Sequence, residues 1–172
     1  MDIQVFPVGP TIGRLFCGGR AYRCALGRAG LSDNKNEGDG ATPIGRFPLR
    51  QIMFRPDRVA SFETALAMRP LCRSDGWCDD PDDPDYNHLI ERPFQASHEI
   101  MWRDDHLYDL VVELGYNDAP VIAGRGSAVF MHVASPGYLP TEGCVALALN
   151  DLLAVIAECD PASTLTVNPA SA

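Results

Sequence analysis

The sequence is poor in positive charge and contains no long apolar run. Its 14 Lys and Arg residues are outnumbered by 23 Asp and Glu residues, which gives a formal net charge of −9. Proteins that bind nucleic acid need basic surfaces to pair with phosphates, so we expect no nucleic-acid partner. No stretch of about 18 apolar residues is present, so we expect no membrane insertion. The N-terminus lacks a basic start followed by an apolar run, and we therefore expect a cytoplasmic protein.

Common metal-binding and nucleotide-binding patterns are also missing. Six Cys and four His are scattered without a CxxC pair, so we expect free thiols, no structural metal and no cofactor. The glycine-rich segment 27–45 lacks the GxxxxGK[ST] and GxGxxG patterns of phosphate-binding loops. The acidic segment 73–87 lacks EF-hand spacing, so we favour a solvated surface loop over a calcium site.

Short strand-like runs separated by turn signals fill most of the chain. Residues 150–158 show apolar positions at helical spacing behind Asn150, and we predict a helix there with Asn150 as its N-cap. Residues 59–68 fit a helix or a strand, and residues 42–45 are predicted to form a turn. The pattern predicts one domain over residues 1–172, mainly β with one or two helices, as a β-sandwich or partly closed barrel. We predict strands over residues 3–8, 13–17, 20–26, 47–54, 108–116, 128–133, 145–149 and 164–167.

The segment 129–147 carries the candidate chemistry. His132 lies in an apolar strand-like run, and Cys144 follows twelve positions later, after a loop that allows the chain to turn back. A cysteine becomes a strong nucleophile when a base such as His removes its proton. Gly143 permits close backbone approach, so we expect the amides of Gly143 and Cys144 to point at a developing oxyanion. The alternatives are an inert core pair and a metal site that uses His132 and Cys144 as ligands.

A second candidate region is the acidic segment 73–87, which two aromatic residues flank. Large aromatic side chains on a polar loop usually pack on the core or on a ligand, so Trp77 is a candidate for substrate contact. We interpret the segment, with Trp77 near one end and Tyr86 near the other, as an ordered flap over a cleft.

Three motifs in order resemble those of the YkuD-like L,D-transpeptidase catalytic domain. His132, a loop and then Thr141-Glu142-Gly143-Cys144-Val145 resemble the family signature of a His followed by [S/T]-x-G-C. Thr42 to Phe47 resembles its T-P-x-G-x-F segment, and Gly124 to His132 fits the strand that carries the base. Together these motifs cover roughly residues 35–158.

The resemblance implies a β-rich fold, a Cys nucleophile and peptidoglycan stem peptides or muropeptides as partners. Attack on the bond before a terminal D-Ala would release D-Ala and leave a thioester on Cys144. Water would then make the protein an L,D-carboxypeptidase, whereas an amine would make it a crosslinking L,D-transpeptidase. The missing export signal favours the cytoplasmic carboxypeptidases of muropeptide recycling. The alternatives are a transpeptidase and a non-catalytic module that binds peptidoglycan peptides, and the oligomeric state stays open.

The chain departs from the family pattern in its carboxylate-binding residue. Ala146 stands where the family usually has Arg or Asn, and the His-to-Cys spacing is short. A guanidinium binds carboxylates bidentately, so we predict that Arg125, or else Arg46, replaces the missing side chain. Thr141, which opens the motif, is a further candidate for substrate binding. We also predict that Asp79 and Asp80 attract the free amine of a diamino acid.

Overall fold

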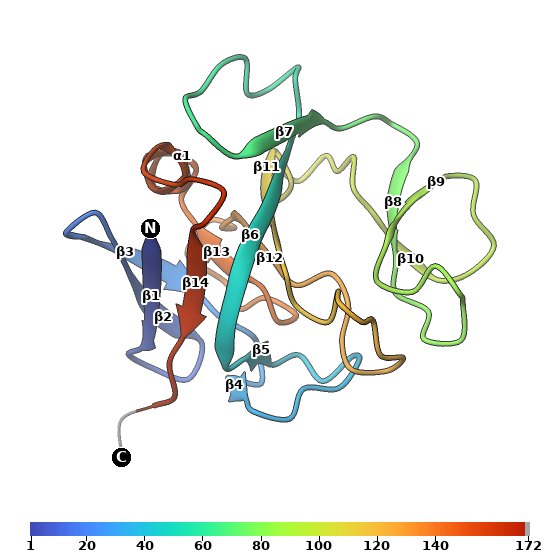
Figure 1. Cartoon of the computed structure of the whole chain (residues 1–172), viewed down its shortest axis with the longest axis horizontal. Helices are drawn as coiled ribbons and strands as arrows, with labels where there is room; N and C mark the ends of the chain where they lie inside the picture. Colours follow the sequence, from blue (N-terminus) through green and yellow to red (C-terminus); the bar gives the residue numbers. More distant parts are fainter. Residues whose placement is uncertain (171–172) are drawn as a thin grey trace.

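The computed structural model describes residues 1–170 and consists mainly of short strands with one helix (Figure 1). The elements are β1 (Asp2–Pro7), β2 (Ile12–Cys17), β3 (Arg20–Ala25), β4 (Leu31–Ser32), β5 (Thr42–Pro43), β6 (Gly45–Phe54), β7 (Ala67–Pro70), β8 (Asp75–Cys78), β9 (Leu89–Glu91), β10 (His98–Ile100), β11 (Leu110–Leu114), β12 (Phe130–Val133), β13 (Val145–Leu147), α1 (Leu149–Ala157) and β14 (Thr164–Val167).

The largest sheet has nine strands in the order β11-β12-β13-β3-β2-β1-β14-β6-β7. A further antiparallel pairing of β11 with β6 joins strands from opposite parts of this order, and the sheet therefore curls into a partly closed barrel. The predicted fold class, mainly β with a partly closed barrel, is confirmed. Most predicted strands form with shifted ends; the segment predicted over residues 47–54 begins two residues earlier, at Gly45.

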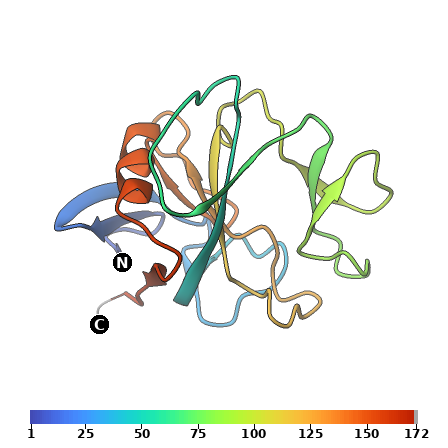
Figure 2. The same cartoon turned by 45° about the horizontal axis from the view of Figure 1, so that its top comes forward.

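Two hydrophobic clusters organise the molecule. The larger one lies between the strands of the main sheet and the buried face of α1, which Leu152, Val155 and Ile156 provide. The smaller one lies between the main sheet and a separate three-stranded sheet, β10-β8-β9, and contains Trp77 and Phe130. Figures 1 and 2 show this small sheet set apart from the barrel, on the side away from α1.

Three local predictions need correction. The helix begins at Leu149 with Ala148 at its N-cap, so Asn150 lies inside the first turn and caps nothing. Thr42 and Pro43 form the short strand β5, which pairs in parallel with β4, rather than a turn. The acidic segment 73–87 contains strand β8, because Asp75 to Cys78 are buried and pair on both sides.

All six cysteines are free, as predicted. Within residues 1–170, no three His, Cys, Asp or Glu side chains come close enough to hold a metal ion. In the same part of the chain, no helix is long and apolar enough to cross a membrane.

Candidate active site

Strands β12 and β13 bring the predicted base and nucleophile to one face of the sheet. They pair in parallel, with His132 opposite Ala146, and Cys144 directly precedes β13. Side chains alternate between the two faces of a strand, so Cys144 and Ala146 point to the same face as His132. Met131 and Val145 point to the other face and join the larger core. The loop between the strands therefore turns the chain back as predicted.

That face borders a cavity of about 360 Å³ that lies between the barrel wall and the segments around the small sheet. The charged residues on its wall come from four separate segments of the chain. The residues that line the cavity are Lys35, Glu37, Gly38, Asp79, Glu99, Arg103, Leu107, Tyr108, Ser127, Ala128, Val129, His132, Ser135, Leu139, Pro140, Thr141, Glu142, Gly143, Cys144 and Ala146.

Cys144 is only 7% exposed, and its thiol is held by the chain around the start of β12. Its Sγ–H donates to the carbonyl oxygen of Ala128 at 3.2 Å, and the N–H of Phe130 donates to Sγ at 3.4 Å. Burial raises the pKa of this thiol to about 12, and the nearby carboxylate of Glu99 acts in the same direction. At neutral pH the resting thiol therefore keeps its proton.

The imidazole of His132 is equally buried and is oriented by the backbone. Nδ1 lies 2.9 Å from the carbonyl oxygen of Val133, which favours the tautomer with the proton on Nδ1 and a free lone pair on Nε2. The ring also packs edge-on against Tyr108, with 5.4 Å between ring centroids. Burial lowers the pKa of His132 to about 4, so the resting pair is a neutral imidazole and a neutral thiol.

The turn before Cys144 is fixed by hydroxyl groups. The hydroxyl of Thr141 donates to the carbonyl oxygen of Cys144 at 2.7 Å and accepts from the N–H of Gly143 at 3.1 Å. The amide of Gly143 is thus engaged inside the turn, which corrects the prediction that it points at an oxyanion. Gly143 is needed for a different reason: its φ is +140°, and a Cβ there would lie 2.8 Å from the carbonyl oxygen of Ala41.

The model of the family described as YkuD, L,D-transpeptidase catalytic domain, matches residues 17–167. The chain belongs to this family. The match includes all three motif segments, and the structure brings the T-P-x-G-x-F segment against the turn that carries Cys144. The hydroxyl of Thr42, from the T-P-x-G-x-F segment, accepts a hydrogen bond from the N–H of Gly27 at 2.8 Å. It donates one to the carbonyl oxygen of Cys144 at 3.4 Å.

One solved structure is similar at 14% sequence identity with a TM-score of 0.48: the helical cell shape determining protein Pgp2 from Campylobacter jejuni. The match covers 99% of this chain and 48% of that chain, so this chain spans about half the length of the similar protein. No curated protein matches the sequence.

The predicted substrate-binding residues other than Thr141 lie outside the cavity wall. Arg125 is exposed and donates to the side-chain oxygens of Asn34 and Asn36, which ties two loops together. Arg46 is exposed on β6, where its Nε donates to Thr164 Oγ1 at 3.0 Å. Trp77 is buried in the smaller core, with its Nε1–H bonded to Asn87 at 3.0 Å.

Several polar residues that line the cavity were not singled out from the sequence as site residues, among them Glu99, Tyr108, Arg103 and Lys35. Glu99 accepts a 2.5 Å hydrogen bond from Tyr108, and burial raises the pKa of the Glu99 carboxyl. Arg103 lies over the Tyr108 ring and pairs with Asp105. Lys35 is the only lysine of the chain, and this single occurrence is the one sequence signal that could have drawn attention to it.

Proposed function

We propose that this chain is a cysteine-dependent L,D-carboxypeptidase that removes the terminal D-Ala from peptidoglycan tetrapeptide stems. The observation that carries the proposal is the placement of Cys144 and His132 on one face of β12 and β13, where both line one cavity. The chain's membership of the L,D-transpeptidase catalytic domain family supports the choice of stem peptides as substrate. We expect soluble muropeptides in the cytoplasm to be the natural form, and this remains a prediction.

The proposed reaction starts from the neutral pair. As substrate excludes water from the cavity, Nε2 of His132 takes the thiol proton and Sγ of Cys144 attacks the carbonyl carbon. The carbonyl π electrons move to oxygen and return when the C–N bond breaks. His132 passes its proton to the leaving amine of D-Ala, and the acyl group stays on sulfur. A water molecule that gives a proton to His132 then attacks the thioester, and the carboxylic acid and thiol are released.

The size of the cavity favours water over a second stem peptide as the acceptor. Its volume of about 360 Å³ lies near the lower end of the range of roughly 300–1,000 Å³ that is usual for ligand sites. Such a space suits the end of one peptide, and a water molecule can follow once D-Ala leaves. A crosslinking reaction would need additional room for a second peptide beside the thioester.

The cavity wall also suggests how the donor peptide is recognised. Oδ1 of Asp79 is buried and has no hydrogen-bond partner among residues 1–170. A buried oxygen without a partner costs free energy, which a donor from a bound ligand would recover. We therefore propose that Asp79 accepts hydrogen bonds from the free ammonium group of a diamino acid. We also propose that Arg103, which lines the same cavity, binds a carboxylate of the substrate.

The test is incubation of the purified protein with disaccharide-tetrapeptide, with and without an added D-amino acid, followed by mass spectrometry. We expect tripeptide and free D-Ala, with no product from Cys144→Ala. D-amino-acid exchange or peptide dimers would instead identify a transpeptidase. An unchanged peptide would refute both activities and would favour the alternative that the protein is a non-catalytic module that binds peptidoglycan peptides.

The role of Asp79 is tested separately with Asp79→Asn and Asp80→Asn. Asp80 is the matched control because it lies next in the chain, and its Oδ1 accepts from the N–H of Asp82 at 3.1 Å. We expect Asp79→Asn to raise KM for a peptide with a diamino acid at the third position, and to leave KM unchanged for one with norleucine there. Equal KM values for Asp79→Asn and the unmodified protein would contradict the assignment.

A further inference from the structure

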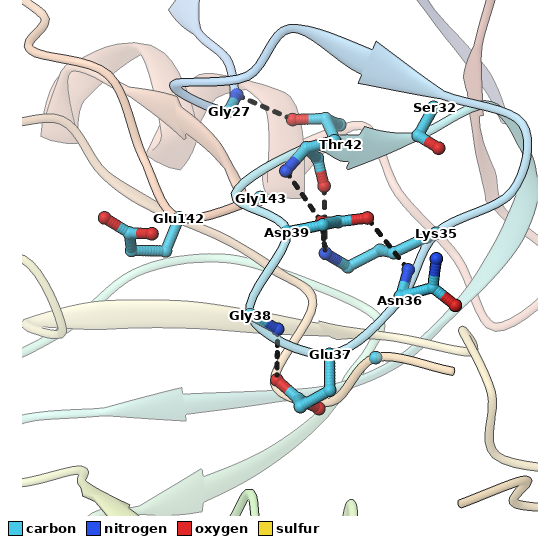
Figure 3. A network of polar contacts seen from close by, with 12 residues as sticks. Gly27, Ser32, Lys35, Asn36, Glu37, Gly38, Asp39, Thr42, Glu142 and Gly143 are labelled. Carbon is cyan, nitrogen blue, oxygen red and sulfur yellow. Dashed lines mark hydrogen bonds and ion pairs between the residues drawn. The ribbon is translucent and has the colours of Figure 1, made fainter. Parts of the chain in front are cut away.

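Lys35 places a buried ammonium group in the wall of the active-site cavity. The side chain is 5% exposed, although lysine is among the residue types least often buried. Its Nζ donates to Asp39 Oδ1 at 2.8 Å and to the carbonyl oxygen of Ala41 at 3.0 Å. Figure 3 shows the side chain crossing the inside of its own loop toward Asp39. The ion pair with Asp39 offsets the free-energy cost of burying the charge.

Two glycines bring the backbone close to this side chain and fix its position. A Cβ on Gly143 would lie 3.1 Å from Nζ of Lys35, and a Cβ on Gly126 would lie 2.8 Å from its Cε. Both glycines have positive φ, +140° and +99°. Gly143 directly precedes Cys144, so the ammonium lies against the backbone of the nucleophile's own turn (Figure 3).

The ammonium also has hydrogen-bonding capacity left. A protonated lysine carries three N–H donors, and the recorded hydrogen bonds of Lys35 use two of them. Of the two amides expected to face the oxyanion, those of Gly143 and Cys144, the amide of Gly143 is occupied by Thr141. The positive charge of Lys35 lowers the pKa of Cys144, against the larger raising effects of burial and of Glu99.

We propose that the Lys35 ammonium stabilises negative charge at Cys144: first the thiolate, and then the oxyanion of the tetrahedral intermediate. The third N–H donates a hydrogen bond, and no proton leaves Lys35. The thiolate part is independent of the substrate, whereas the oxyanion part rests on the proposed function. Other charged or titratable groups that face the site are Glu37 and Asp39 on the Lys35 loop, Glu142 in the turn, Asp79 and Glu99 from the small-sheet side, and Arg103, Tyr108 and His132.

The experiment measures the rate of Cys144 alkylation by iodoacetamide between pH 6 and 11, with peptide mapping to separate the six cysteines. We compare the unmodified protein with Lys35→Met, Lys35→Arg and the double variant Lys35→Met/Asp39→Asn. The double variant removes both partners of the ion pair, so it leaves no unpaired carboxylate if Lys35→Met alone fails to fold. Cys72 is the internal reference because it is exposed and does not line the cavity.

We expect Lys35→Met and the double variant to move the Cys144 profile to higher pH and to slow its alkylation at pH 8 about tenfold, which corresponds to one pKa unit. Lys35→Arg should keep the original profile, and Cys72 should react equally in all proteins. The proposal would be overturned if Lys35→Met or the double variant folded and its Cys144 alkylated with the same pH profile as in the unmodified protein. Lys35 would then only stabilise the conformation of its own loop. Because no peptide is used, a Lys35-dependent profile would stand even if the carboxypeptidase assay failed.

Discussion

The hydroxyl of Thr141 donates a 2.7 Å hydrogen bond to the carbonyl oxygen of Cys144, which closes the turn onto the residue that carries the thiol. Thr141 also joins this turn to the end of β3, since its N–H donates to Leu26 and its carbonyl accepts from Arg28. Thr141 therefore lies in the cavity wall and at the same time determines where the nucleophile sits.

Substitution of Thr141 should for this reason affect stability as well as activity. Thr141→Val leaves the N–H of Gly143 without its partner and leaves the carbonyl of Cys144 with only the longer hydrogen bond from Thr42, and an unmet buried group costs roughly 1–3 kcal/mol. We expect a loss of that size in urea denaturation, with a lower kcat, and recovery in Thr141→Ser. Thr166→Val, on β14 away from the cavity, is the control. Equal stability of the two valine variants would contradict this role.

Recognition of the substrate carboxylate distinguishes Arg103 from the arginines that the sequence suggested. The recorded side-chain hydrogen bonds of Arg103 run from Nε and Nη2 to Asp105, while the residue lines the cavity. A hydrogen bond to a charged group contributes roughly 1.5–3 kcal/mol, so we expect Arg103→Met to raise KM for the tetrapeptide at least tenfold. Arg125→Met and Arg46→Met should keep KM within about twofold. A large increase in KM for Arg125→Met alone would instead support the sequence-based prediction that Arg125 binds the substrate carboxylate.

The sequence was informative where local pattern decides structure. Alternation and turn signals located most strands, and the spacing of Leu152, Val155 and Ile156 located the helix. The cap at Asn150 was wrong because α1 begins directly after the buried strand β13, so the position of the strand decides where the helix starts. Local propensity was overridden there by tertiary structure.

The active site could be predicted only in part from the sequence, because some of its residues are brought together by tertiary packing. His132 lies in β12 and Cys144 directly precedes the neighbouring strand β13, with one loop between them, so their approach follows from local order along the chain. Lys35 and Glu99 reach the cavity from distant segments, through packing of loops and of the small sheet against the barrel. Residue type alone does not show which charged side chain of a loop faces inward, and the sequence therefore pointed to Arg125 and Arg46 without singling out Arg103.

Trp77 should prove to be a structural residue. Its ring packs edge-on against Phe130, with 5.0 Å between centroids, and its Nε1–H bonds to Asn87 at 3.0 Å. We expect Trp77→Ala to lower the free energy of unfolding by about 3–5 kcal/mol, as is usual for removal of a buried aromatic ring. Trp77→Phe should cost less and leave KM for the tetrapeptide unchanged. A stable Trp77→Phe protein with a much higher KM would instead support the predicted substrate contact.

The buried imidazole of His132 should make the folded state sensitive to acid. Burial lowers its pKa from 6.5 to about 4, so the unfolded chain takes up this proton at a higher pH than the folded chain does. The stabilisation is therefore fully present above pH 6.5 and is lost as the pH falls toward 4. At 1.36 kcal/mol per pKa unit, the loss is on the order of 3 kcal/mol.

The measurement is urea denaturation of the unmodified protein and of His132→Gln at pH 7.5 and pH 4.5. Carboxylates elsewhere titrate in both proteins, so the difference between the two losses isolates His132. We expect the unmodified protein to lose more stability on acidification than His132→Gln, by on the order of 3 kcal/mol. Equal losses would mean that the pKa of the imidazole is the same in the folded and unfolded states, which would contradict the effect of burial. A smaller loss for the unmodified protein than for His132→Gln would mean that folding raises this pKa, and the resting pair would then have to be described as an imidazolium and a thiolate.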